Sequence, residues 1–79
     1  MSPTVHREGA YAFRFYSADK DEPPHVHIWS NRSRAKFWLK PVRIARNCGF
    51  SQQELNAIEK LVIQYQEKLL EAWNDYFGD

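Results

Sequence analysis

Residues 51–77, with the sequence SQQELNAIEKLVIQYQEKLLEAWNDYF, carry the most regular hydrophobic pattern in the chain. They begin with a capping box, in which the Ser51 hydroxyl and the Glu54 carboxylate each satisfy a backbone N–H at the start of a helix. Apolar residues then recur every three or four positions and share one helix face: Leu55, Ile58, Val62, Tyr65, Leu69, Trp73 and Tyr76. Nothing interrupts this pattern before Gly78, so the sequence predicts a single long helix over residues 51–77.

The N-terminal half has the period of two that is typical of half-buried strands. Turn residues separate the three runs that show it, which are residues 10–16, 25–29 and 34–40. Residues 4–7 predict a further short strand, whereas Pro41 excludes a central-strand position for the ambiguous segment 41–50. We therefore expect an α+β fold in one domain over residues 1–79. Its antiparallel meander has three to five strands within residues 4–46, and the single C-terminal helix packs on one face.

The size and cysteine content of the chain exclude several protein classes. Its 79 residues and 9.4 kDa allow one modest core and are too few for a nucleotide-binding α/β fold. The single Cys48 has no partner for an internal disulfide, and we expect it to be a small filler residue before the helix. No run of about 18 apolar residues and no cleavable signal is present. We expect a cytoplasmic protein with no membrane association, and we assign it no cofactor.

The net charge of +1 conceals a division between the two halves of the chain. Residues 1–46 contain nine Lys and Arg against four acidic residues, a local net charge of +5. Residues 47–79 contain two Lys against six acidic residues, a local net charge of −4. Such asymmetry indicates either a functional face on one half or attraction between the halves of neighbouring copies.

The strand registers follow from the side-chain period. With a turn centred on residues 31–32, His27 faces Lys36, and in the neighbouring pair Arg14 faces His27. One sheet face then becomes an apolar bed for the helix. The other face is predicted to be free of carboxylates and to collect Arg14, Tyr16, His25, His27, Trp29, Arg34, Lys36, Trp38 and Lys40.

Cations interleaved with aromatic side chains suit single-stranded nucleic acid, because cations neutralise phosphates while bases stack on rings. Alternatively, Trp29 and Trp38 cover a second hydrophobic layer or a dimer interface, with Lys and Arg stems packed over them. We expect a module that binds RNA, DNA or an acidic partner protein. A homodimer through the spare helix arc at Ile63, Leu70 and Phe77 is a further structural hypothesis. The predicted binding residues are Arg14, Tyr16, Trp29, Arg34, Trp38 and Lys40.

The sequence PPHVH at residues 23–27 places two imidazoles on one strand face, about 6.6 Å apart along the chain. As metal ligands, His25 and His27 require a third ligand, and their predicted neighbours Arg14 and Lys36 repel a cation. We therefore assign no metal site.

Two other interpretations of this histidine pair stay open. As catalysts, His25 and His27 supply the acid and base of a metal-independent ribonuclease, with Lys36 stabilising the charge of a phosphorane. As structural groups, they hydrogen-bond Ser17, Asp19 or loop carbonyls and fix the 17–24 loop. The structural interpretation carries the largest single weight. His6 is expected to be a strand-edge residue.

Five segments of the chain form a recognisable set: FYS at 15–17, PHVH at 24–27, AKFWL at 35–39, NxGFS at 47–51 and ExWNxYF at 71–77. Together they resemble the small bacterial family of DUF4160-like domains of unknown function, whose signature is Pro-His-Val-His. The resemblance covers nearly the whole chain and implies that Pro24, His25 and His27 are central. It also implies a neighbouring short gene of unknown function, an arrangement similar to a toxin–antitoxin module. It supplies no established activity.

Overall fold

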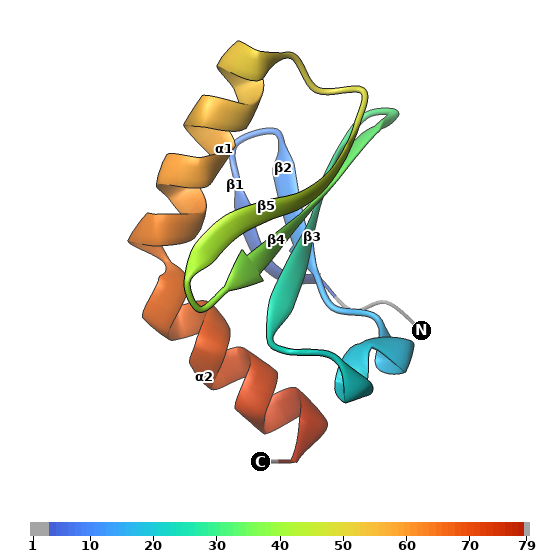
Figure 1. The fold of residues 1–79 in the computed structure, drawn as a ribbon, viewed down its shortest axis with the longest axis vertical. Coiled ribbons are helices and arrows are strands. Elements are labelled where there is room, and N and C mark those ends of the chain that lie inside the picture. The colour runs from blue at the N-terminus through green and yellow to red at the C-terminus, as the bar shows by residue number, and fades with distance from the viewer. Residues whose placement is uncertain (1–3, 79) are drawn as a thin grey trace.

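A five-stranded antiparallel sheet with two helices on one side forms the fold in the computed structural model, which describes residues 4–78 (Figure 1). The strands lie side by side in chain order. They are β1 (Thr4–Glu8), β2 (Tyr11–Arg14), β3 (His25–Ser30), β4 (Ser33–Leu39) and β5 (Val42–Cys48). A 3-10 helix, η1 (Ser17–Asp21), connects β2 to β3, and α1 (Gln52–Gln64) and α2 (Gln66–Phe77) follow the sheet. The expected α+β class and antiparallel meander are confirmed.

The predicted strand registers are also confirmed. His27 pairs with Lys36 between β3 and β4, and Arg14 pairs with His27 between β2 and β3. The predicted limit of the strands at residue 46 is wrong, because β5 runs to Cys48. Pro41 does not prevent this strand, since it lies in the turn that precedes it.

The single helix predicted over residues 51–77 is wrong, because the chain bends at Tyr65 between α1 and α2 (Figure 1). Tyr65 has φ −104° and ψ 14°, outside the helical range. Its hydroxyl donates to Glu8 Oε1 at 2.9 Å, and Gln66 Nε2 donates to the Leu39 carbonyl at 2.6 Å. These tertiary bonds hold the bend against β1 and the end of β4. The apolar spacing continues through it, so the sequence pattern carries no sign of the break.

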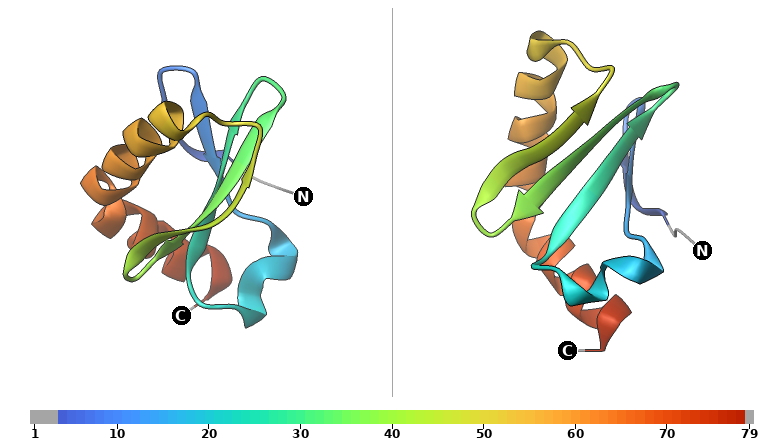
Figure 2. Two further views of the ribbon diagram at one scale, coloured as in Figure 1. Left: turned by 45° about the horizontal axis from the view of Figure 1, so that its top comes forward. Right: turned by 45° about the vertical axis from the view of Figure 1, so that its right-hand side comes forward.

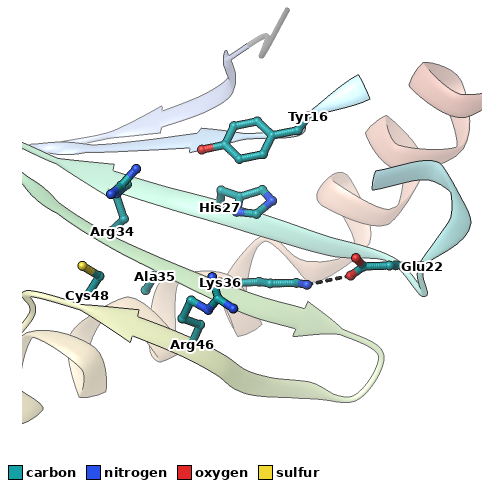
Figure 3. Close-up of a pocket in the computed structure, with 8 residues that line it drawn as sticks. All are labelled: Tyr16, Glu22, His27, Arg34, Ala35, Lys36, Arg46 and Cys48. Carbon is teal, nitrogen blue, oxygen red and sulfur yellow. Dashed lines mark hydrogen bonds and ion pairs between the residues drawn. The ribbon is translucent and has the colours of Figure 1, made fainter. Parts of the chain in front are cut away.

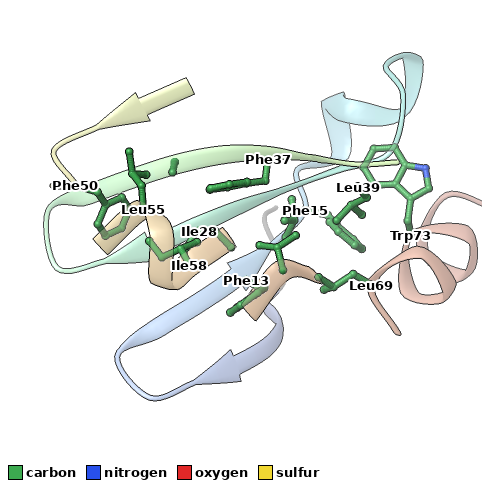
Figure 4. Packing of buried hydrophobic residues seen from close by; sticks show 13 residues of the cluster. Phe13, Phe15, Ile28, Phe37, Leu39, Phe50, Leu55, Ile58, Leu69 and Trp73 are labelled. Atoms are coloured by element: carbon green, nitrogen blue, oxygen red, sulfur yellow. The ribbon is translucent and has the colours of Figure 1, made fainter. Parts of the chain in front are cut away.

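The core lies between the sheet and the two helices (Figure 4). As predicted, alternate residues of β2, β3 and β4 face it, and the capping box at Ser51 and Glu54 starts α1. The spare helix arc is smaller than predicted: Ile63 is 55% exposed, but Leu70 and Phe77 pack against the core. The buried cluster contains Phe13, Phe15, Val26, Ile28, Ala35, Phe37, Leu39, Phe50, Leu55, Ile58, Val62, Leu69 and Trp73.

Candidate functional site

The sheet face opposite the helices carries a row of basic side chains that crosses four strands. Arg14, His27, Lys36 and Arg46 are successive cross-strand partners on β2, β3, β4 and β5. Neighbouring strands lie about 4.8 Å apart, so the row is about 14 Å long. This face is the one that the sequence predicts to be cationic.

A pocket of about 420 Å³ opens in the middle of this face (Figure 3). The exposed Arg34 and Arg46 line it, together with the half-buried Lys36. Its complete lining is Tyr16, Glu22, His27, Arg34, Ala35, Lys36, Arg46 and Cys48. Four of the predicted site residues, Tyr16, His27, Arg34 and Lys36, therefore meet in one place.

Two lining residues, Arg46 and Cys48, come from β5 and were not predicted to belong to the site. The β4–β5 register shifts between Lys36, which pairs with Arg46, and Phe37, which pairs with Ile44. One extra residue is thus inserted in β5, and such a bulge breaks the alternation that identifies strand faces. The expectation that Cys48 is a filler is wrong, because the longer strand leaves it exposed beside the pocket.

The prediction that this face lacks carboxylates is also wrong, because the η1 segment folds over one end of it (Figure 2). Glu22 approaches Lys36, whose Nζ donates to Glu22 Oε1 at 2.6 Å (Figure 3). This hydrogen bond, together with the lysine charge, lowers the pKa of Glu22. Asp19 lies deeper and is only 8% exposed.

His25 is fully buried, so the prediction that it lies on an open sheet face is wrong. Its ring lies between the Trp38 and Trp73 rings, at centroid distances of 5.5 and 5.1 Å. Nδ1 is 2.9 Å from the Pro23 carbonyl oxygen. Nε2 is 3.0 Å from Asp19 Oδ2, yet it makes no hydrogen bond of acceptable geometry to any residue described in the structure.

His27 is half-buried beside the pocket. Its Nε2 lies 2.9 Å from Asp19 Oδ2, and its ring stacks on Tyr16 with a centroid distance of 3.9 Å. Burial lowers the pKa of His27, and the hydrogen bond to Asp19 opposes this shift. The Tyr16 backbone N–H also donates to Asp19 Oδ2, at 3.0 Å. One buried carboxylate oxygen therefore ties β3 to the η1 segment, as the structural interpretation of the histidines expects.

A protein-family model describing a domain of unknown function (DUF4160) matches residues 10–74. The chain belongs to the DUF4160 family. No curated protein and no solved structure matches this DUF4160 chain. Among residues 4–78, no helix has the length and apolar character needed to cross a membrane.

The DUF4160 motifs separate into a site motif and a folding motif. The Pro-His-Val-His signature contributes His25 and His27 to the cluster around Asp19. The segment at 47–51 instead shapes the turn into α1: the Asn47 side chain both donates to the Phe50 carbonyl and accepts from its N–H. Gly49 has φ +102°, and a Cβ there would lie 2.7 Å from Ser33 Oγ.

On the sheet face opposite the helices, the tryptophan rings of this DUF4160 domain already make cation–π contacts with neighbouring basic side chains. The guanidinium groups of Arg14 and Arg34 lie 5.3 and 4.9 Å from the Trp29 ring centroid, and Lys36 Nζ lies 4.6 Å from that of Trp38. Trp29 Nε1 also donates to the Tyr16 hydroxyl at 2.8 Å. These contacts favour packed cation–π pairs over free stacking platforms.

Lys40, the last predicted binding residue, is exposed in the β4–β5 turn and does not line the pocket. It borders a second hollow of about 220 Å³ with Trp38, Arg43 and two prolines. The predicted site residues therefore divide between a central pocket, this hollow, the buried His25, and Arg14 and Trp29, which line neither the pocket nor the hollow.

Proposed function

We propose that this DUF4160 domain binds the phosphate backbone of a nucleic acid, RNA or DNA, through its central pocket. The observation that carries the proposal is the convergence of Arg34, Lys36 and Arg46 from two strands on one concave surface. Guanidinium groups hold phosphate through paired hydrogen bonds, which suits this lining. Glu22 is the carboxylate that lines the pocket, and it is already paired with Lys36.

Backbone recognition is favoured over base stacking because Trp29 and Trp38 are covered by their own cations. We therefore expect binding with little sequence preference and a steep dependence on salt, since counterions are released from each neutralised phosphate. Binding is favoured over metal-independent RNA cleavage by the position of His25. Both nitrogens of this buried ring face Pro23 and Asp19 rather than the pocket.

The test measures the affinity of the protein for fluorescent single-stranded RNA and DNA across a salt series. The double variant Arg34→Ala/Arg46→Ala should bind about tenfold or more weakly at low salt. Its slope of log affinity against log salt should fall by about 0.7 for each phosphate that the variant no longer neutralises. Arg7→Ala is the matched control, because Arg7 is exposed on β1 and lies outside the pocket lining.

Equal affinity and equal slope for the double variant and the wild type would overturn the proposal. Binding to polyglutamate but not to nucleic acid would replace it with an acidic partner protein. That outcome fits the short neighbouring gene and the toxin–antitoxin arrangement that the family resemblance implies. RNA cleavage in excess chelator that disappears in His27→Ala would instead support the ribonuclease.

A further inference from the structure

The geometry points to a binding site for one divalent transition-metal ion, such as Zn²⁺, formed by Asp19, His25 and His27. Each residue offers one ligand atom, and the three atoms lie within 4.8 Å of one another. Asp19 comes from η1, and both histidines come from one face of β3. The site lies beyond the proposed anion-binding pocket, although His27 belongs to both.

The unpartnered Nε2 atom of His25 is the first independent reason for the proposal. Because a carbonyl oxygen only accepts hydrogen bonds, the 2.9 Å contact with the Pro23 carbonyl places a proton on Nδ1. In the neutral ring, Nε2 then carries a lone pair and lies 3.0 Å from Asp19 Oδ2. Two buried electron-rich atoms repel each other at this distance, and a cation between them removes the conflict.

The crowding of Asp19 Oδ2 is the second reason. Three nitrogens lie within 3.0 Å of this oxygen, namely Nε2 of His25, Nε2 of His27 and the Tyr16 backbone N–H. A carboxylate oxygen has two lone pairs, which His27 and the Tyr16 N–H already engage, so Oδ2 has none left for His25 Nε2. With a bound ion, the histidine lone pairs turn to the metal and the Tyr16 N–H remains to orient the carboxylate.

Two of the three ligand–ligand distances are close to those of a tetrahedral site. Zn–N and Zn–O bonds of about 2.0–2.1 Å place ligand atoms about 3.3 Å apart. Asp19 Oδ2 is 2.9 and 3.0 Å from the two histidine nitrogens, so these two pairs reach that separation by an expansion of a few tenths of an ångström. The two nitrogens lie within 4.8 Å of each other.

The supporting contacts of a metal site are also in place. The Pro23 carbonyl fixes the tautomer of His25, as partners behind metal-ligating histidines do. Trp38 and Trp73 flank that ring, and Tyr16 stacks on His27. Both imidazoles are therefore held in place before an ion binds.

The neighbouring charges balance better than the sequence indicates. Lys36 and Arg14 flank His27 across the sheet. Lys36 is paired with Glu22, whose Oε1 is also 3.9 Å from His25 Nδ1. The Arg14 guanidinium lies against Trp29. The negative charges of Asp19 and Glu22 therefore balance those of Arg14 and Lys36, the two cations that the sequence predicts to repel a metal ion.

The ligand set selects a class of metal. Two imidazoles and one carboxylate suit Zn²⁺, Co²⁺ or Fe²⁺, whereas Ca²⁺ requires six to eight oxygen ligands. Three protein ligands leave at least one coordination position for water or an anion. His27, which also lines the proposed anion-binding pocket, connects the two sites.

The experiment uses the whole chain after treatment with chelator and its removal. Titration with Co²⁺ should produce visible d–d absorption that saturates at one ion per chain, and Zn²⁺ should displace it and raise the melting temperature. Asp19→Asn and His27→Gln should each weaken binding by about tenfold or more. The controls His6→Gln and Cys48→Ser, which change groups outside the cluster, should bind as the wild type does.

Two results would overturn the site. One is the absence of saturable Co²⁺ absorption together with a melting temperature that Zn²⁺ does not change. The other is a decrease of affinity in Cys48→Ser or His6→Gln as large as that in Asp19→Asn. If either cluster variant fails to fold, the wild-type titration and these two controls still decide the matter.

Discussion

The two ends of the open sheet face share one strand pattern but have opposite environments. At the covered end, η1 brings its own Asp19 against His25 and His27, and all three residues are buried or half-buried. At the open end, beside β5, Arg34 and Cys48 are exposed, as is Arg46. Strand alternation assigns a residue to a face, and only the rest of the chain decides whether that face meets solvent. We expect the covered end to govern stability and the open end to govern binding.

The largest expected effect on stability comes from truncating Trp73, the core residue that packs beneath the covered end. Trp73 is 4% exposed, and its ring lies 5.1 Å from that of His25 and 5.3 Å from that of Phe15. Trp73→Ala should lower the free energy of unfolding by about 3–5 kcal/mol, because it leaves a large cavity. Urea denaturation measures the decrease. Tyr76→Ala is the control, since Tyr76 is 38% exposed, and an equal decrease there would contradict this expectation.

A smaller but still large effect is expected from the carboxylate at the covered end. Asp19→Ala should lower the free energy of unfolding by about 2–4 kcal/mol, because the half-buried His27 and the Tyr16 N–H are left without their acceptor. Glu22→Ala, on the same segment, should cost at most about 1 kcal/mol, because its ion pair with Lys36 is exposed. Both are measured by urea denaturation in chelator, so that no metal contributes. Similar decreases for the two variants would remove the distinction between a buried and an exposed carboxylate.

The smallest effect on stability is expected at the open end. Arg34→Ala and Arg46→Ala should each change the free energy of unfolding by less than about 0.5 kcal/mol, because both side chains are exposed. Thermal and urea denaturation check this. A decrease of twice that size or more would mean that these arginines stabilise the sheet, and any weakening of nucleic-acid binding would then need another explanation.

The parts of the fold that sequence predicts well depend on local rules. The period of two fixes which residues of β2, β3 and β4 face the core, and the turn at residues 31–32 sets the β3–β4 register. The capping box at Ser51 satisfies the first backbone N–H groups of α1 with side chains three residues apart. Each rule involves neighbours in the chain or across one tight turn, so no knowledge of the remaining structure is needed.

The parts that sequence does not predict depend on distant contacts. The bend at Tyr65 is held by Glu8, 57 residues earlier in the chain, and no change in apolar spacing accompanies it. The β5 bulge adds one residue and hides the fact that Arg43 and Arg46 share a face. The sequence indicates Asp19, the third member of the histidine cluster, only as one of several hydrogen-bond partners. The position of Asp19 depends on how η1 folds back over the sheet, and the hydrophobic periodicity of the sequence does not predict that path.

The outer edge of β5 has a consequence for solubility. No further strand pairs with β5 among residues 4–78, so seven residues of backbone present unpaired N–H and C=O groups along one side. Such an edge is a template for strand addition by another copy, and charged side chains near it keep copies apart. Arg43 and Arg46 supply that like-charge repulsion. We therefore expect the removal of charge from this strand to have two effects at once, on the proposed binding of polyanions and on the protection of the chain against its own aggregation.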